Sequence, residues 1–127
     1  MAFVYYNPNP WRLSTDDCTV RALSLALGME WPEAYDLLSE TGRDMGLMPT
    51  NPAVMWALLK MRGFTREALP DKCPDCYTVA DFARDHPNGL YVVATGTHIL
   101  CTIGGDWLDS WNSGDEVPMY YWHRKVR

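Results

Sequence analysis

The stretch HILCTIGGDWLD, residues 98–109, predicts two short strands joined by a tight turn. The glycine pair Gly104-Gly105 favours a two-residue hairpin loop, because that loop needs a positive φ at its central positions. Such a loop pairs His98 with Trp111, which places Asp109 diagonally opposite His98. Since alternate residues of a strand share one face, we expect His98 and Asp109 to lie within hydrogen-bonding reach of each other.

The rest of the chain predicts helices before this hairpin and further strands around it. Gly28 ends the first helix, Trp31-Pro32 begins the second, and the second is expected to end before Gly42. Helices followed by an antiparallel sheet indicate an α+β fold, in a single domain over residues 1–127. We expect helices over residues 17–27, 31–41, 51–63 and 78–86, and strands over residues 90–95, 98–103, 107–111 and 117–122.

Composition limits the classes of function. The chain has 127 residues, 47% of them apolar and 21% charged, as in an ordinary globular protein. A net charge of −5 disfavours nucleic acid as a partner. The basic cluster at residues 123–127 is expected to be a solvated chain end. No apolar run approaches the roughly 20 residues of a membrane span, and the N-terminus does not resemble a signal peptide. We therefore expect a cytoplasmic protein with reduced cysteines and no membrane partner.

Cys18 stands where the first helix is expected to begin. Ser14 and Asp17 have the spacing of a capping box, which would place the thiol in the first turn. Free backbone N–H groups and the helix dipole favour the thiolate there. Asp16 and Asp17 oppose it, so an adjacent imidazolium would be needed. The alternative is that Cys18 is a small apolar core residue.

Cys18, His98 and Asp109 supply, in chain order, the three groups of a thiol hydrolase. A thiolate attacks a carbonyl, an imidazole transfers the proton, and a third group orients the imidazole. Each residue alone also has a purely structural explanation, and a longer hairpin loop would bring Ser110 or Asn112 beside His98 instead. The oxyanion would be held by the backbone N–H of Cys18 and by one upstream side-chain donor, for which the candidates are Asn7, Asn9, Ser14 and Thr15.

The other cysteines predict no cofactor. Cys73 and Cys76 form a C-x-x-C pair, but no second pair completes a zinc site, so we expect a solvent-facing loop with two reduced thiols and no metal. Cys101 falls in the middle of a strand, on the face opposite His98, and is expected in the core. Six tryptophans and seven tyrosines exceed what one small core buries, so some must line a groove or an interface.

Three short blocks carry a resemblance to a known family. DCTVRALSLALG at residues 17–28, GTHIL at 96–100 and DSWNS at 109–113 resemble small papain-like cysteine peptidases of the kind found in bacteriophages and prophages. The resemblance implies a papain-like fold with N-terminal helices packed on a C-terminal antiparallel sheet. It also implies Cys18 as nucleophile, His98 as base and Asp109 where papain-type enzymes have an orienting asparagine. The chain contains no glutamine, so it lacks the glutamine with which these enzymes usually hold the oxyanion.

These observations favour a thiol hydrolase of a bacterial host's cytoplasm. It would cleave a peptide or isopeptide bond of a peptide or protein substrate through an acyl-enzyme, with Trp111 shielding the contact between His98 and Asp109. A second hypothesis is a catalytically silent binding or inhibitory module on the same fold. A third is an acyltransferase that uses the same three residues and passes the acyl group to an amine. The oligomeric state is left open.

Overall fold

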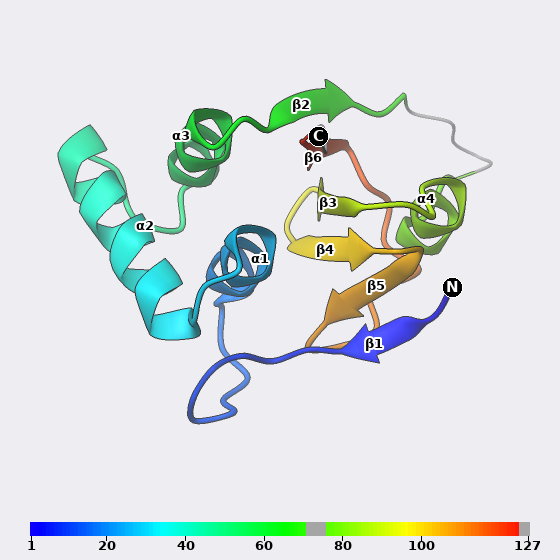
Figure 1. Cartoon of the computed structure of the whole chain (residues 1–127), viewed down its shortest axis with the longest axis horizontal. Coiled ribbons are helices and arrows are strands. Elements are labelled where there is room, and N and C mark those ends of the chain that lie inside the picture. Colours follow the sequence, from blue (N-terminus) through cyan, green and yellow to red (C-terminus); the bar gives the residue numbers. More distant parts are fainter. Residues whose placement is uncertain (71–75, 125–127) are drawn as a thin grey trace.

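A computed structural model describes residues 1–70 and 76–124 of the chain. In this part of the chain, helices and strands form an α+β fold, as expected (Figure 1). The elements are β1 (Phe3–Tyr5), α1 (Cys18–Leu27), α2 (Trp31–Met45), α3 (Pro52–Met61), β2 (Thr65–Ala68), α4 (Val79–Asp85), β3 (Leu90–Ala94), β4 (Ile99–Ile103), β5 (Asp106–Asp109) and β6 (Tyr120–His123).

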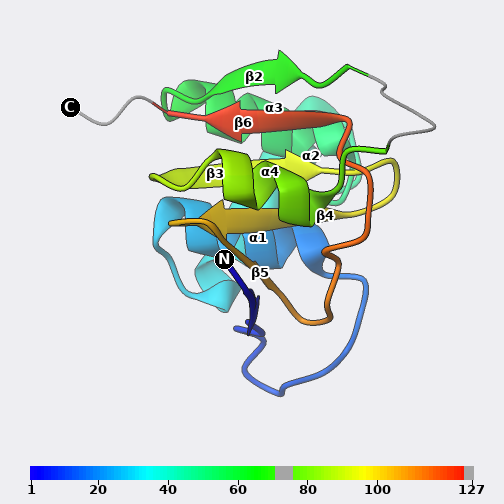
Figure 2. The ribbon, with the colours of Figure 1, turned by 90° about the vertical axis from the view of Figure 1, so that its right-hand side faces the viewer.

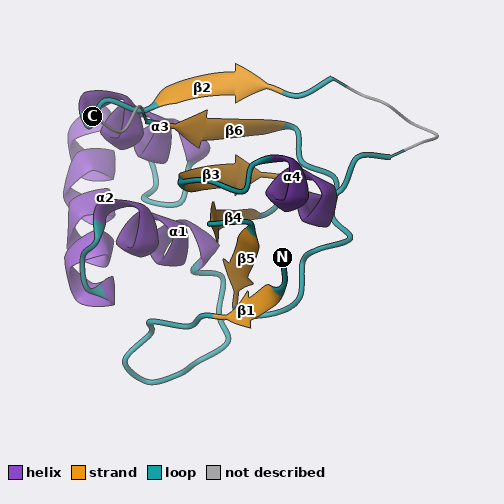
Figure 3. Cartoon of the chain, turned by 45° about the vertical axis from the view of Figure 1, so that its right-hand side comes forward, coloured by secondary structure: helices purple, strands orange, loops and turns teal. Residues whose placement is uncertain are grey.

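The sheet separates two hydrophobic clusters. On one face α1 packs against the sheet and α2 packs on α1 and α3, around buried residues such as Leu23, Leu59 and Val92. On the other face α4 covers a smaller cluster that includes Phe82 and Leu100 (Figure 3). Alternate residues of the central strands therefore point into different clusters, which explains the near-continuous apolar pattern of β3 and β4.

The sheet is mixed, and the expectation of an antiparallel sheet is wrong for one pair of strands. Its order is β1-β5-β4-β3-β6-β2. The neighbours from β5 to β2 pair antiparallel, whereas β1 pairs parallel with β5, Val4 lying opposite Leu108. Figure 2 shows β2 beside β6 at the sheet edge away from the N-terminus. The sequence gives little sign of the two edge strands, because β1 is very short and β2 (TREA) has little apolar character.

The hairpin between β4 and β5 has the predicted register. Ile103 lies opposite Asp106, and Cys101 lies opposite Leu108. Gly104 and Gly105 form the loop with φ angles of 58° and 88°, a conformation that favours glycine. The predicted two-residue turn is therefore confirmed.

Two expectations about helix ends are wrong. The second helix does not end before Gly42 but continues to Met45, and Gly46 ends it with a φ of 74°. Gly42 is needed for close packing instead, since a Cβ atom there would lie 2.8 Å from the carbonyl oxygen of Leu47. The capping box of Ser14 and Asp17 does not form, because Asp17 is itself the N-cap and its carboxylate is used elsewhere.

The remaining strand bounds shift by a few residues, most of all for the last strand, which spans Tyr120–His123 rather than residues 117–122. Cys101 is buried, and its thiol donates to the carbonyl of Ala22, as expected of a core residue. Cys76 is exposed, and Cys73 lies outside the described residues. Within residues 1–70 and 76–124, none of the helices has the length and apolar character that crossing a bilayer requires.

Candidate active site

Cys18 is the first residue of α1. Its backbone N–H belongs to the first turn and has no acceptor within the helix, so it is free to bind another oxygen. The side chain is partly buried and lines a groove on the surface. Asp17 turns away from the thiol, because its carboxylate pairs with Arg21 and accepts a hydrogen bond from Trp31 Nε1 at 2.9 Å. The repulsion expected from Asp17 is thus offset by a cation.

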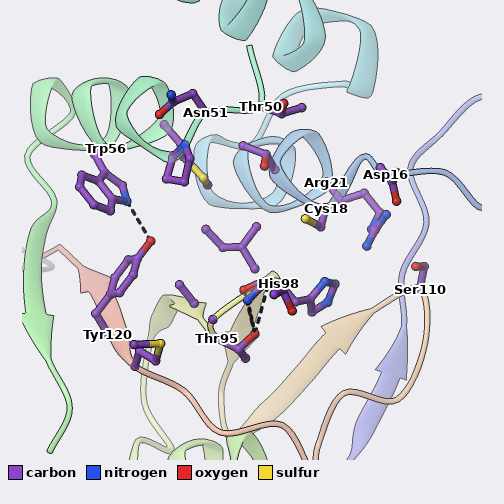
Figure 4. Close-up of a pocket in the computed structure, with 18 of the residues that line it drawn as sticks. Asp16, Cys18, Arg21, Thr50, Asn51, Trp56, Thr95, His98, Ser110 and Tyr120 are labelled. Atoms are coloured by element: carbon purple, nitrogen blue, oxygen red, sulfur yellow. Dashed lines mark hydrogen bonds between the residues drawn. The ribbon is translucent and has the colours of Figure 1, made fainter. Parts of the chain in front are cut away.

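His98 is held at the beginning of β4 by the turn that leads into it. Thr95, at the end of β3, is buried, and its hydroxyl accepts the backbone N–H of His98 at 3.1 Å. The backbone N–H of Thr95 in turn donates to the carbonyl of His98 at 2.8 Å. Figure 4 shows hydrogen bonds that meet at the Thr95 hydroxyl, below Cys18. A short, doubly bonded turn therefore fixes the imidazole opposite the N-terminus of α1.

Asp109 ends β5 and is almost completely buried, with 2% of its surface exposed. His98 Nε2 lies 2.6 Å from Asp109 Oδ2, as the hairpin register predicts. The same carboxylate accepts the hydroxyl of Ser113 at 2.6 Å and the backbone N–H of Ser110 at 2.8 Å. Asn112 lies elsewhere, accepting the indole N–H of Trp107 at 2.9 Å. Of Asp109, Ser110 and Asn112, the three residues expected as possible partners of His98, Asp109 is the one that bonds to the imidazole.

Arg21 is a site residue that the sequence reasoning missed. It lies one helical turn after Asp17, is 5% exposed, and pairs with the carboxylates of both Asp17 and Asp109, the latter at 3.2 Å. The guanidinium thereby ties the beginning of α1 to the end of β5. The spacing of Asp17 and Arg21 on a helix was a detectable signal, although nothing in the sequence showed that the pair is buried.

The pKa shifts at the site all favour charged side chains. Burial alone would raise the pKa of the Cys18 thiol, but hydrogen bonds from the His98 side chain and the Ile99 backbone N–H lower it. Burial would lower the pKa of His98, but its bonds to Asp109 and Cys18 raise it to about 9. Burial would raise the pKa of Asp109, but bonds from His98 and Ser113 hold it below its usual value. The arrangement supports a thiolate beside an imidazolium.

The groove that Cys18 lines has a volume of about 860 Å³. It lies between α1 and α3 on one side and the turn from Ala94 to His98 on the other. Figure 4 shows Cys18 and His98 toward one part of it, and Trp56 and Tyr120 at the far end, joined by a hydrogen bond of 2.9 Å. An extended chain laid along this groove would pass directly over the thiol.

The four suggested oxyanion donors divide into two pairs. Ser14 and Thr15 are exposed and line the groove beside Cys18. Asn7 and Asn9 do not line it; they order the preceding loop, Asn7 by donating to the carbonyl of Leu13 and Asn9 by accepting the backbone N–H of Trp11. The geometry thus leaves Ser14 and Thr15 as the side-chain candidates.

Trp111 flanks the imidazole. Its ring centroid lies 4.8 Å from that of His98, and 46% of its surface is exposed. The indole therefore lies against the imidazole, and its expected shielding role stays a prediction. Among the described residues, no group of three or more histidine, cysteine or acidic side chains is arranged to hold a metal ion.

Comparisons of the chain with models of protein families, with curated proteins and with solved structures find no match.

Proposed function

We propose that this protein is a thiol hydrolase that cleaves peptide or isopeptide bonds through a Cys18–His98–Asp109 triad. The observation that carries the proposal is the grouping of three side chains at the edge of a groove: His98 lowers the pKa of the Cys18 thiol, and His98 Nε2 lies 2.6 Å from the buried carboxylate of Asp109. We further propose that the α+β architecture is a small variant of the papain-like fold. The order of the three residues, a cysteine at a helix N-terminus followed by a histidine and a carboxylate on neighbouring strands, supports this view.

The geometry suits an acyl-enzyme mechanism. The Cys18 thiolate attacks the carbonyl carbon, and a C–S bond forms as the carbonyl electrons move to oxygen. The backbone N–H of Cys18, with Ser14 or Thr15, donates hydrogen bonds to that oxygen. His98 gives its proton to the leaving amine as the C–N bond breaks, which leaves a thioester. Water then attacks the thioester while His98 takes up a proton, and the carboxylic acid leaves as the thiolate is restored.

Asp109 supports this sequence without taking the proton. It binds Nε2 of His98, which leaves Nδ1 for the Cys18 sulfur, and it stabilises the imidazolium that persists until the amine departs. Its bonds to Arg21 and Ser113 keep the carboxylate ionised and fixed in place. Trp111 excludes water from the exposed side of the imidazole, which strengthens the contact with Asp109.

The pH dependence of Cys18 alkylation by iodoacetamide tests the proposal. Mass spectrometry follows each cysteine separately, with exposed Cys76 as an internal control for an ordinary thiol. Cys18 is expected to react at pH values well below the free-thiol pKa of about 8.5. In a His98→Ala variant that reactivity should be lost, whereas His123→Ala, which removes an imidazole paired with Glu67 far from the site, should leave it unchanged.

Hydrolysis of a peptide library then tests the reaction itself. Cleavage that Cys18→Ala abolishes and Cys76→Ala retains supports the hydrolase, and an amide product formed only with an added amine would indicate acyl transfer instead. If Cys18 reacts no faster than Cys76 at pH 6 and no peptide is cleaved, the proposal is wrong. A binding or inhibitory role for the groove would then be the better hypothesis.

A further inference from the structure

A second groove lies beyond the end of the active-site groove, between α3 and β2. We call it the α3–β2 groove; its volume is about 540 Å³. It shares Ala53 and Trp56 with the active-site groove, so the two grooves adjoin at these residues. Trp56 lies at the end of the active-site groove away from Cys18 (Figure 4). The residues that line the α3–β2 groove are Ala53, Trp56, Ala57, Lys60, Phe64, Thr65, Arg66 and Trp122.

The α3–β2 groove is lined by cations that lack acidic partners. The guanidinium carbon of Arg66 lies 4.3 Å from the ring centroid of Trp56 and 5.5 Å from that of Tyr120. Stacking holds the guanidinium in place while leaving its N–H groups available. In residues 1–70 and 76–124, neither Arg66 nor Lys60 has a carboxylate within ion-pair distance. In a protein of net charge −5, two unpaired cations in one groove form a local site for an anion.

One side chain that lines the α3–β2 groove carries an unsatisfied donor. Trp122, on β6, is 5% exposed, and its indole N–H is buried without an acceptor in the described part of the chain. A buried donor without an acceptor is unusual in a folded protein. The lining of the α3–β2 groove includes the cations of Lys60 and Arg66 and no acidic side chain.

The charge of the lining side chains differs between the active-site groove and the α3–β2 groove. Near Cys18 the exposed charged side chain is that of Asp16, since Arg21 is buried and paired. Beyond Trp56 the charged side chains are Lys60 and Arg66. An acidic side chain of a bound peptide is therefore disfavoured beside the thiol and favoured beyond Trp56.

We propose that the α3–β2 groove is a subsite for an acidic side chain of the peptide substrate, at a distance from the bond that is cleaved. The inference rests on the proposed function, because it assigns the active-site groove to a peptide. The carboxylate would bind Arg66 and Lys60, while the aliphatic part of the acidic side chain would pack against Trp56.

Peptides that alkylate Cys18 test this inference without any need for hydrolysis. Synthetic peptides of alanine and leucine carry a chloroacetyl group at one end or the other and a glutamate at two to five residues from it. Each peptide is compared with a second peptide in which glutamine replaces the glutamate at the same position. The ratio of the two alkylation rates on Cys18 cancels the intrinsic reactivity of the thiol. It therefore tests the subsite even if the triad proves inactive.

We expect one glutamate position to react about fivefold faster than its glutamine partner, the upper range for a single exposed ion pair. In Arg66→Gln the ratio should fall to about one. Arg62→Gln is the matched control, because it removes the same charge from a residue that lines neither groove, and it should keep the preference. Equal rates for glutamate and glutamine at every position, or a preference that survives Arg66→Gln combined with Lys60→Gln, would overturn the inference. Slow alkylation by iodoacetamide with a retained preference would instead reject the triad and keep the subsite.

Discussion

Replacing Arg21 by methionine should destabilise the protein strongly. Arg21, Asp17 and Asp109 form a buried cluster, in which each side chain has 6% or less of its surface exposed. Methionine keeps the helix and most of the aliphatic volume but removes the cation between two carboxylates. Loss of one partner from a buried ion pair typically costs about 3–5 kcal/mol, because the remaining charge stays buried without compensation.

The two carboxylates should not contribute equally to that loss. Asp109 keeps the donors of His98, Ser113 and the Ser110 backbone. Asp17 keeps only the indole N–H of Trp31 among its side-chain partners in the described residues. Most of the cost should therefore come from Asp17, and adding Asp17→Asn to Arg21→Met should restore the larger part of it.

Urea unfolding followed by tryptophan fluorescence gives the free energies of unfolding of the wild type, both single variants and the double variant. A double-mutant cycle then isolates the coupling of Asp17 with Arg21. A loss below about 1 kcal/mol in Arg21→Met, the range of an exposed ion pair, would refute the reasoning. So would a double variant that is less stable than Arg21→Met alone.

Two further predictions concern pH and packing. In Cys18→Ala, the free energy of unfolding should fall as pH rises from 6.5 toward 9, because Asp109 still raises the pKa of His98, so that folded His98 keeps a proton that the unfolded chain releases near pH 6.5. The wild type should show a weaker dependence of this free energy on pH, since its Cys18 thiolate offsets the proton on His98. Equal slopes for the two proteins in urea titrations at several pH values would contradict the pairing of Cys18 with His98. Gly42→Ala should lower the free energy of unfolding by about 1–3 kcal/mol, because the new methyl group would press on the carbonyl of Leu47, whereas Ser39→Ala, elsewhere on α2, should change thermal unfolding little.

Local sequence patterns were sufficient to predict the central hairpin and the helix positions. A two-residue hairpin turn requires backbone angles that few residue pairs other than Gly104-Gly105 adopt. The glycine pair therefore predicted the register of the hairpin, and the register predicted the contact between His98 and Asp109. The prolines in the first turns of α2 and α3 likewise predicted where these helices begin. In each case the signal lies within a few residues of the structure that it determines.

The features that escaped prediction depend on distant parts of the chain. β1 is a strand because it pairs with β5, and its own three residues carry no pattern. Position 42 needs a glycine because the carbonyl of Leu47 lies close to it, and the sequence alone does not distinguish this reason from a helix end. Nothing in the sequence around Arg21 indicates burial, because only the docking of α1 on β4 and β5 buries it.

The separation of the site residues along the chain also affects the protein while it is being made. Arg21 and Asp109 are 88 residues apart, and Cys18 is made before nearly all of the sheet that carries its base. On the ribosome, the thiol therefore emerges as an ordinary cysteine with no imidazole to ionise it. If Cys18 is the nucleophile that we propose, it becomes reactive only when β4 and β5 have left the exit tunnel and packed against α1. Under the proposed function, synthesis and activation are thus separated in time, and a nascent chain does not present an activated thiol to its surroundings.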